Sequence, residues 1–401
     1  MITIEECLRR VLKPVKPIEE YETLPLNKLC GRISCRDVIA SSSVPPFSKA
    51  AMDGYAVKAE DTAKAGSSGE VSLKVTGKLL AGDYKDIEYG KNTAVRVMTG
   101  AYVPDGFDAV VRQEDTDMGE NRVVIKKQVH SGENYCMAGE DVRCGDVILK
   151  KGELIDSIRI GMLASAGTAY ADVVRKPKIT IVSTGSELTE PGEALLPGKI
   201  YASVGYMLGA AAEKNGVEVY GSYLCGDNEN EAKNFIYKAV EASDMVITTG
   251  ALSVGERDFI PSLLKNMGAR TLFRGADIQP GTPTMASLLE DKVVLSLSGN
   301  PYAAMANFEL YFWDIMAGMT GCNGMRPVIS TAYLADDYNK VNMRRRLIRA
   351  KAEKGKVYLP SRIHSSSVIN NLTLCNCFID LEPGRKVKKG DEVKIRYIKG
   401  M

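Results

Sequence analysis

The chain has 401 residues, of which 45% are hydrophobic and 25% are charged. This composition is typical of soluble globular domains and excludes a disordered or fibrous protein. Because the count of Lys plus Arg (52) nearly equals that of Asp plus Glu (50), the balance argues against a broad basic surface for nucleic acid. No run of about 18 apolar residues is present, so no membrane span is expected, and the first residues lack the order of a signal peptide.

The cysteines and histidines limit which catalytic and metal-binding sites the chain can form. Nine cysteines are scattered without a CxxC pair, which disfavours a zinc ribbon or a thiol-redox motif and fits a reducing, cytoplasmic location. Cys375 and Cys377 lie two apart in an apolar run, so both are expected to pack on one side of a strand. With only His130 and His364, catalysis by Ser-His-Asp and multi-histidine metal sites are disfavoured. Any metal would be a hard cation held by carboxylates.

The N-terminal half predicts a helix followed by a strand-rich domain. Thr3 and Glu6 have the spacing of a capping box, and the apolar residues that follow have helical spacing until Pro14. Short β-like runs between residues 71 and 127, separated by glycine-rich or acidic turns, predict a small domain of strands. A helical pattern at 156–166, with Gly167 as its C-terminal cap, precedes the next change.

From residue 179 the chain alternates between apolar strands and amphipathic helices over about 140 residues, which predicts a parallel, doubly wound sheet. Residues 325–327 mark a further joint. The remaining residues are strand-like, with a hairpin turn at Lys354-Gly355, and predict a small all-β domain.

Candidate ligand-binding residues lie where the parallel strands end, because open sheets of this type bind ligands in the crevice at that edge. Small and hydroxyl residues at helix starts can hold phosphate, and carboxylates there suit Mg²⁺. Each turn alone has a purely geometric explanation, Asp258 could cap the helix that starts at Phe259, and Glu187 could be a solvated loop residue. The four segments are 184–187, 226–227, 249–255 and 298–301, with Glu187, Asp227 and Asp258 as the carboxylates.

At these positions the chain resembles the MoeA family of molybdopterin molybdenumtransferases, which is related to the E domain of gephyrin. The resemblance covers nearly the whole chain. The matching segments, in order, are VPPFSKAAMDGYAV at 44–57, VMTGAYVPDGFDAVVRQED at 97–115, GEDV at 139–142, STGSEL at 183–188, SVGERDF at 253–259, PGTP at 280–283 and SGNPYAA at 298–304.

The resemblance implies a multidomain α/β fold and an elongated homodimer. Its active site would lie between the doubly wound domain of one subunit and the strand-rich domain of the other. The implied divisions are an N-terminal helix (1–20) packed on the linking region or the α/β domain, an elongated linking domain (21–43 and 141–175), a strand-rich domain (44–140), a MogA-like α/β domain that binds molybdopterin (176–325) and a barrel-like C-terminal β domain (326–401).

The implied activity belongs to molybdenum cofactor biosynthesis. Molybdate is inserted into adenylated molybdopterin with the assistance of Mg²⁺, and AMP is released. The implied partners are these small molecules, a second copy of the chain, and possible contacts with a MogA-like adenylyltransferase and with recipient molybdoenzymes.

The resemblance also assigns roles to residues. Asp53, Glu187, Asp227 and Asp258 would be catalytic, and Asp141, Glu187, Asp227 and Asp258 would hold the metal. Simpler alternatives are that Asp53 is a turn residue, that Thr99 caps local backbone and that Arg349 is a solvated strand residue. The implied binding residues are Thr99, Thr184, Gly185, Ser186, Gly250, Ser253, Gly255, Gly299, Asn300, Pro301, Arg349 and Ser366.

The chain departs from the family pattern at the crevice. Gln279 and Thr282 replace both lysines of a KPGKP segment, Ala251 replaces a glycine, Ser298 replaces a proline, and 202–204 lacks two polar side chains. The lost cations would be partners of molybdate or phosphate, and losing one is costly unless it is replaced. Candidate replacements are Arg274, Arg257 and the run Arg344, Arg345 and Arg346, although such a run also fits a solvated strand edge.

Three functions therefore remain open from the sequence. The first is an active molybdenum insertase with a rewired anion pocket. The second is a non-catalytic relative that binds molybdopterin or the finished cofactor as a carrier or assembly factor, and the third is a protein for another nucleotide-linked ligand. The retained carboxylates favour the first, and the missing lysines favour the second.

Overall fold

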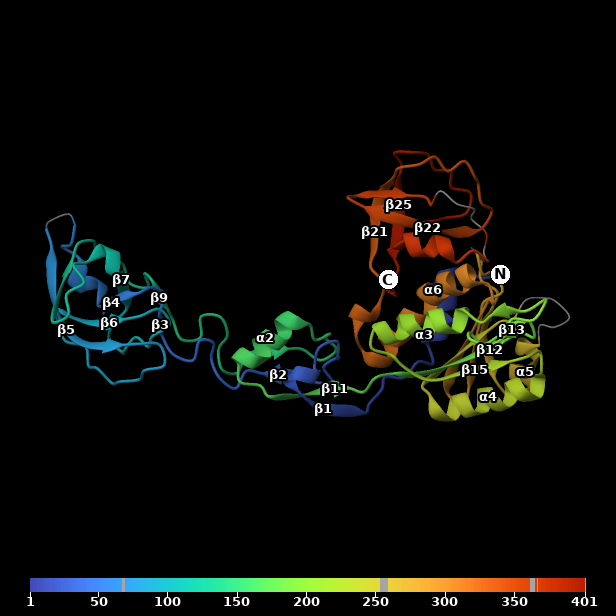
Figure 1. Cartoon of the computed structure of the whole chain (residues 1–401), viewed down its shortest axis with the longest axis horizontal. Coiled ribbons are helices and arrows are strands. Elements are labelled where there is room, and N and C mark those ends of the chain that lie inside the picture. Colours follow the sequence, from blue (N-terminus) through green and yellow to red (C-terminus); the bar gives the residue numbers. More distant parts are fainter. Residues whose placement is uncertain (67–68, 253–258, 361–364, 366, 401) are drawn as a thin grey trace.

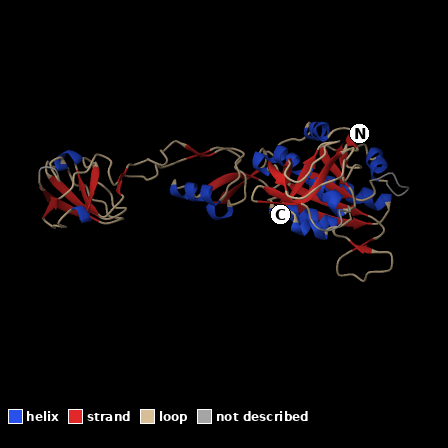
Figure 2. Ribbon diagram, turned by 90° about the horizontal axis from the view of Figure 1, so that it is seen from above, coloured by secondary structure: helices blue, strands red, loops and turns tan. Residues whose placement is uncertain are grey.

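The computed structural model describes residues 1–66, 69–252, 259–360, 365 and 367–400. Figure 1 shows an elongated molecule with a strand-rich domain at one end, a small linking region in the middle, and the α/β domain together with the C-terminal sheet at the other end. Figure 2 shows the same order from above. Within the described residues, no helix combines the length and apolar character that crossing a bilayer requires.

The strand-rich domain is a five-stranded sheet in the order β7-β4-β6-β5-β8, and only its β5–β6 pair is parallel. Its valine-rich strands bury both faces, so it has its own core. Its elements are β3 (Lys49–Ala50), β4 (Gly54–Val57), η2 (Ala59–Thr62), β5 (Val71–Leu79), β6 (Thr93–Val97), β7 (Ala109–Arg112), η3 (Gln113–Asp115), β8 (Arg122–Ile125) and β9 (Tyr135–Cys136).

The linking region consists of two chain segments that cross it in opposite directions, so its strands pair antiparallel, β1 with β11 and β2 with β10. The predicted helix is confirmed as α2, whose N-cap Asp156 accepts a hydrogen bond from the Arg159 amide at 2.8 Å. The elements are β1 (Tyr21–Pro25), η1 (Leu26–Lys28), β2 (Val38–Ile39), β10 (Val147–Leu149), α2 (Ser157–Ser165) and β11 (Tyr170–Val174).

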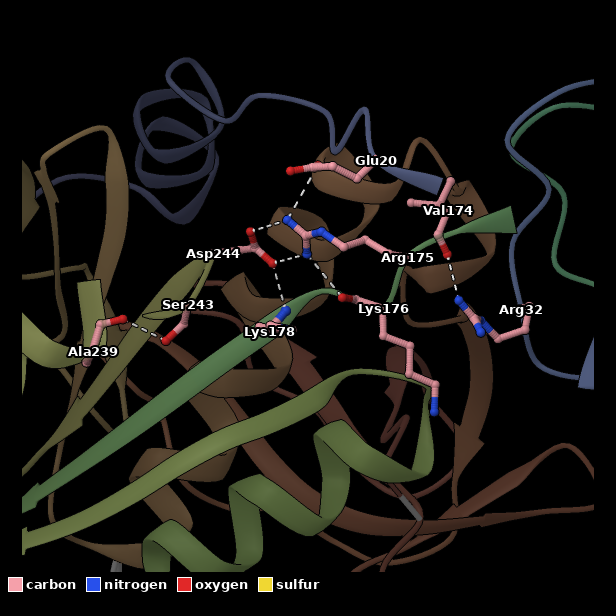
Figure 3. Close-up of polar contacts among 9 residues, drawn as sticks. All are labelled: Glu20, Arg32, Val174, Arg175, Lys176, Lys178, Ala239, Ser243 and Asp244. Carbon is pink, nitrogen blue, oxygen red and sulfur yellow. Dashed lines mark hydrogen bonds and ion pairs between the residues drawn. The ribbon is translucent and has the colours of Figure 1, made fainter. Parts of the chain in front are cut away.

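A polar junction joins the linking region to the α/β domain (Figure 3). Arg175 donates two hydrogen bonds to Asp244, with distances of 2.7 and 2.8 Å, and its guanidinium also lies 3.5 Å from Glu20. The Lys178 amide donates to the same Asp244 carboxylate at 2.8 Å. Burial alone raises the pKa of Asp244, but the hydrogen bonds from Arg175 and Lys178 outweigh it and hold that pKa below its usual value.

The α/β domain confirms the predicted doubly wound sheet. Beside the parallel strands β15, β12, β16 and β20, the sheet continues with β19, which is antiparallel to β20, and ends at β17, which is antiparallel to β19; the sequence pattern had predicted neither strand. Helices α1, α3 and α6 pack in one core with the sheet, and α4 and α5 contribute to a second core. The strands are β12 (Lys178–Thr184), β13 (Leu188–Thr189), β14 (Ile200–Tyr201), β15 (Glu218–Cys225), β16 (Met245–Thr249), β17 (Arg270–Arg274), β19 (Met285–Leu289) and β20 (Lys292–Leu297).

The helices agree with the predicted alternation of strands and helices. In α1, Thr3 accepts a hydrogen bond from the Glu6 amide at 3.2 Å, as the capping-box spacing predicts. The Glu6 carboxylate instead bonds Arg9 and Arg10 on the next turn. The helices are α1 (Ile4–Leu12), α3 (Val204–Lys214), α4 (Glu229–Ala242), α5 (Ile260–Asn266) and α6 (Pro301–Thr320).

The C-terminal strands form a barrel-like sheet that closes through an added β22–β24 pairing. The predicted hairpin turn is present, with positive φ at Lys354 (49°) and Gly355 (75°). Cys375 and Cys377 are both buried, which confirms that they pack in the core. Only Cys377 lies on β24, because Cys375 caps the preceding 3₁₀ helix, so the prediction that both lie on one strand is wrong for Cys375. The elements are β18 (Ile278–Gln279), η4 (Asn323–Met325), β21 (Ile329–Leu334), β22 (Arg345–Glu353), β23 (Lys356–Tyr358), η5 (Asn370–Leu374), β24 (Cys377–Leu381) and β25 (Glu392–Tyr397).

Candidate functional site

A cavity of about 480 Å³ lies where the parallel strands end. Three of the turns predicted from the sequence contribute to its lining, and the segment before α3 and the C-terminal β domain complete it. This arrangement is the crevice expected at the carboxyl edge of a doubly wound sheet. The described lining residues are Ser183, Thr184, Glu187, Leu188, Ile200, Tyr201, Ala202, Ser203, Val204, Thr249, Gly250, Ala251, Leu252, Pro283, Ser298, Gly299, Asn300, Pro301, Ser367 and Ile369.

The turns pack closely, and glycine is required at position 250 by a backbone contact and favoured at position 185 by a φ of +153°. A Cβ on Gly250, whose φ is +89°, would lie 2.1 Å from the carbonyl oxygen of Thr184. A Cβ on Gly185 would lie 2.7 Å from an oxygen of the Glu187 carboxylate, which folds back over this turn. The glycines therefore bring β12 and β16 together at the crevice and leave backbone amides at its edge.

Two helices begin at the cavity. Ser203 and Val204 at the N-terminus of α3 line the cavity, and so do Asn300 and Pro301 at the N-terminus of α6. Neither Ser203 nor Asn300, the N-cap residues, makes a side-chain capping hydrogen bond. Pro301, the first residue of α6, has no N–H, but the remaining free amides of the two first turns and the positive ends of the helix dipoles are suited to an anionic group such as a phosphate.

The crevice carboxylates are only partly brought together. Glu187 is exposed and lines the cavity. Asp227 is connected to the same turn, because its amide donates a hydrogen bond at 2.9 Å to the hydroxyl of Ser186, the residue before Glu187. Within the described ranges, no group of three or more His, Cys, Asp or Glu residues could hold a metal ion. Asp258, Ser253 and Gly255 lie outside the described residues.

The second cluster of predicted residues lies in the strand-rich domain. Asp53 Oδ1 accepts hydrogen bonds from the Thr99 amide at 2.7 Å and from the Thr99 hydroxyl at 2.6 Å. These bonds, the side-chain one first, hold the pKa of Asp53 below its usual value. Within the part of the chain that the structure describes, no hydrogen bond reaches Oδ2. The motifs at 44–57 and 97–115 pointed to Asp53 and Thr99 separately, but the hydrogen bonds between the two residues were not predicted.

Asp53, Thr99 and Asp141 do not reach the crevice of their own chain. Asp53 and Thr99 flank strands of the strand-rich domain, and the Asp141 amide donates to the Val44 carbonyl where that domain meets the linking region. The linking region separates this end of the molecule from the α/β domain (Figure 1). The chain therefore carries two candidate half-sites at opposite ends.

Arg349 is fully buried, so the alternative of a solvated strand residue is wrong. Its guanidinium stacks 4.3 Å from the centre of the Tyr302 ring and donates to the carbonyls of Ser365 and Val368. Burial lowers the pKa of Arg349 and raises that of Tyr302 to about 12. Because Ser367 and Ile369 line the cavity, Arg349 fixes the segment that closes it. Ser366 lies outside the described residues.

The charge of the crevice was not predicted. Among its described lining residues Glu187 is the only charged one, so none is a Lys or Arg. A cation that the sequence reasoning missed, Lys199, donates to the carbonyl of Ser186 at the mouth. Its position beside the β13–β14 pair could have been found only from the fold, because β13 and β14 are two residues long.

Comparison with known proteins agrees with this arrangement. Family models match residues 2–167 ("MoeA N-terminal region (domain I and II)"), 180–317 ("Probable molybdopterin binding domain") and 331–397 ("MoeA C-terminal region (domain IV)"). Molybdopterin molybdenumtransferases of Staphylococcus epidermidis and Staphylococcus aureus are each 35% identical over 398 residues, covering 98% of this chain and 95% of theirs. A crystal structure of a molybdopterin biosynthesis MoeA protein from Pyrococcus horikoshii is 30% identical, with a TM-score of 0.86, and covers 99% of this chain and 100% of its own.

Proposed function

Because the chain belongs to the MoeA family of molybdopterin molybdenumtransferases, we propose that it inserts molybdate into adenylated molybdopterin and releases AMP. This reaction makes the chain a transferase of molybdenum cofactor biosynthesis. The observation that carries the proposal is the cavity of about 480 Å³, where two uncapped helix N-termini and glycine-lined strand ends face one space. Backbone donors of this kind suit the phosphate groups of an adenylated ligand.

The chain's own residues then have distinct tasks. The amides at the starts of α3 and α6 bind the phosphate, and the segment held by Arg349 closes the cavity and excludes water. Thr184 donates to the Thr249 carbonyl at 3.1 Å, which fixes the two neighbouring strand ends in register beneath the ligand. These contacts orient the substrate without using a histidine.

Magnesium fits the donors at the crevice. Glu187 and Asp227 supply hard carboxylate oxygens on two turns that Ser186 connects. We assign Glu187 and Asp227 to the metal, with Asp258 as a further candidate ligand. Asp141 does not reach the crevice of its own chain, so it would contribute only from a second copy. When bound, Mg²⁺ would neutralise the negative charge of the phosphate oxygens.

We further propose that the active site is completed by a second copy of the chain. Asp53 and Thr99 form a rigid polar pair, and Asp53 retains an unbonded oxygen within the described residues. A homodimer with two-fold symmetry would bring this pair of one subunit to the crevice of the other. A cytoplasmic location, a MogA-like adenylyltransferase as supplier and molybdoenzymes as recipients belong to the same proposal.

The test is molybdate-dependent release of AMP. Purified protein is mixed with adenylated molybdopterin, Mg²⁺ and molybdate, and AMP and transfer of cofactor to an apo-molybdoenzyme are both followed. We expect release only when molybdate is present. Tight binding of adenylated molybdopterin without AMP release would contradict the proposal and favour a non-catalytic binding protein.

A further inference from the structure

A cavity of about 610 Å³, here called the junction cavity, lies where the linking region meets the α/β domain. One wall comes from β1, η1 and the turn after η1, and the other from the end of α3, the end of η4 and the segment after β25. The walls approach each other closely, because a Cβ on Gly216 would lie 3.4 Å from the carbonyl oxygen of Gly31. Among the described residues, none that lines this cavity also lines the crevice, so the proposed function gives it no role.

The lining of the junction cavity is basic. It holds five cationic side chains and two carboxylates, so it carries three more positive than negative charges. The whole chain has a formal net charge of only +2, and the excess at this cavity is therefore a local concentration of charge that attracts anions. The cations are Lys28, Arg32, Lys176, Lys214 and Lys399, and the carboxylates are Glu22 and Glu213.

Two of the five cations are positioned by the fold. The Arg32 side chain is only 11% exposed, and its guanidinium donates to the Val174 carbonyl at 3.0 Å (Figure 3). Lys399 is held through its backbone, since its amide donates to the buried Glu309 carboxylate at 3.1 Å and its carbonyl accepts from the Asn215 side chain at 3.1 Å. Arg32 and Lys399 are therefore fixed, inner cations of the cavity.

The charge of Lys399 is not balanced by an acidic partner. Its ammonium group donates to the Gly324 carbonyl at 2.7 Å and lies 5.9 Å from the centre of the Trp313 ring. Within the described part of the chain, no carboxylate lies within 4.0 Å of this ammonium group. Burial accordingly lowers the pKa of Lys399. A partly buried cation of this kind gains stability when an anion enters the cavity.

The other three cations are exposed lysines. Lys214 lies in the last turn of α3, where a positive charge also compensates the helix dipole, so its place has a structural explanation. Lys176 extends away from the cluster of Arg175 and Asp244, as Figure 3 shows. Exposed lysines are ordinary on a protein surface, but Lys28 and Lys176 converge on a cavity that already holds two fixed cations.

The lining also limits the chemistry of the ligand. None of the described lining residues is Phe, Tyr, Trp or His, so the cavity offers no ring on which a nucleotide base could stack. Lysine binds phosphate as a point charge, and arginine binds it through paired N–H donors. Because one phosphate group carries about 1.5 to 2 negative charges at pH 7, two such groups balance the excess of positive charge.

We propose that the junction cavity binds a small anion with two linked phosphate groups and no aromatic base. Arg32 and Lys399 are its inner contacts, and Lys28 and Lys176 its outer contacts. Because these cations come from both walls, the bound diphosphate ties the linking region to the α/β domain in addition to the Arg175–Asp244 pair. This site is separate from the crevice and goes beyond the proposed function.

The test uses Cys30, which is exposed and lines the junction cavity. Full-length protein is alkylated with iodoacetamide, with and without millimolar sodium pyrophosphate and without divalent metal ions, and mass spectrometry follows each cysteine. We expect pyrophosphate to slow the alkylation of Cys30 several-fold, because the bound anion blocks access and disfavours the thiolate. Cys144, which is also exposed but does not line this cavity, is the internal control and should react at an unchanged rate.

Substitutions of the outer lysines test the contacts. K28Q/K176Q should raise the pyrophosphate concentration that gives half-maximal protection of Cys30 about tenfold, since two charge contacts are lost. K64Q/K91Q removes two exposed lysines of the strand-rich domain and should leave that concentration unchanged. K399Q, which removes an inner cation, should also weaken protection. Sodium sulfate at the same ionic strength should protect less, because it carries a single tetrahedral group.

Four results would each overturn the inference: unchanged alkylation of Cys30 in pyrophosphate, equal slowing of Cys144, an equal loss of protection in K64Q/K91Q, or equal protection by sulfate. Pyrophosphate bound only at the crevice would leave the rate at Cys30 unchanged, because the described lining of the crevice contains no cysteine. Release of AMP tests the crevice and alkylation of Cys30 tests the junction cavity, so either proposal can fail without the other.

Discussion

The crevice and the Asp53 turn are built in opposite ways. The crevice lies at the ends of strands that are buried on both faces, and the close approach of two of them is fixed by Gly250, which no other residue can replace without a clash. The Asp53 turn is half-exposed, and its carboxylate is held by a single residue, Thr99. In the proposed function, the crevice is the preformed binding site, whereas the Asp53 turn presents a carboxylate that a second copy of the chain would cover.

The difference suggests that the two regions have separate tasks, with substrate binding at the crevice and a catalytic carboxylate at the Asp53 turn. A rigid crevice can bind an anion through backbone dipoles without help from a second chain. The Asp53 carboxylate at the far end of the molecule, in contrast, takes part in the proposed reaction only if a second copy of the chain is bound. Substitutions at the two regions should therefore fail in different ways, and the following predictions exploit that contrast.

The largest effect is expected from Asp53→Asn. This change keeps the shape and removes the charge, and we expect molybdate-dependent AMP release to fall by about 100-fold or more. Because Thr99 holds the pKa of Asp53 below its usual value, the wild-type carboxylate stays charged across pH 5–8, and the loss should not depend on pH there. Asp105→Asn, an exposed aspartate of the same domain, is the control, and an equal loss in it would contradict the assignment.

Gly250→Ala should damage the crevice itself. The new methyl group would lie 2.1 Å from the Thr184 carbonyl oxygen, and the alanine would have to keep a φ of +89°. Because both effects destabilise the fold, we expect a loss of about 2–5 kcal/mol in the free energy of unfolding. Urea unfolding followed by fluorescence reports this domain, because the chain's one tryptophan, Trp313, is buried in α6.

A matched glycine separates the clash from the backbone strain. Gly268 has the same φ of +89°, but nothing lies within 4 Å of its added Cβ. Gly268→Ala should therefore cost only the backbone term of about 1–2 kcal/mol. Equal losses in the two variants would show that the close approach of β12 and β16 is not what requires Gly250.

Asp244→Asn should loosen the junction that joins the two ends of the molecule. Removing this charge leaves Arg175 without its bidentate partner, and we expect a loss of about 2 kcal/mol in the free energy of unfolding. Because the folded-state pKa of Asp244 is lowered, its contribution is present above the usual carboxyl value of 3.8 and disappears as pH falls through the lowered folded value.

The pH dependence provides the check. In urea titrations between pH 7 and pH 3, the stability difference between wild type and Asp244→Asn should shrink only at the acidic end. A difference that stays constant down to pH 3 would mean that the Arg175–Asp244 pair does not carry the effect.

The smallest effect is a stabilisation by Ala251→Gly. Ala251 has a φ of +44°, a left-handed conformation that costs most residues about 1–2 kcal/mol. Glycine should therefore raise the free energy of unfolding by about 1 kcal/mol, after its greater freedom in the unfolded chain is subtracted. The same denaturation assay measures it, and a destabilised variant would show that the methyl group at the crevice is needed for packing.

Periodicity was sufficient to predict the helices and the parallel strands, because their buried faces repeat at the spacing of each element. It did not predict β17 and β19, since β17, β19 and β20 pair antiparallel with no helix between them and leave no strand-helix alternation to detect. The rule that ligands bind at strand ends also predicted three segments that line the crevice, whereas the 226–227 turn does not contribute to its described lining. The contacts of Arg344 and Arg346 with Thr282 and Gln279 could not be predicted, because they depend on the pairing of β18 with β22 across two domains.

The most direct test of the central claim is complementation between the two regions. Glu187→Gln disables the crevice and Asp53→Asn disables the distant turn, and each variant alone should be inactive. Denatured together and refolded as a mixture, they should recover about a quarter of wild-type AMP release, since half of the dimers are mixed and each mixed dimer has one intact site. Mixed dimers that form but release no AMP would contradict an active site shared between two chains.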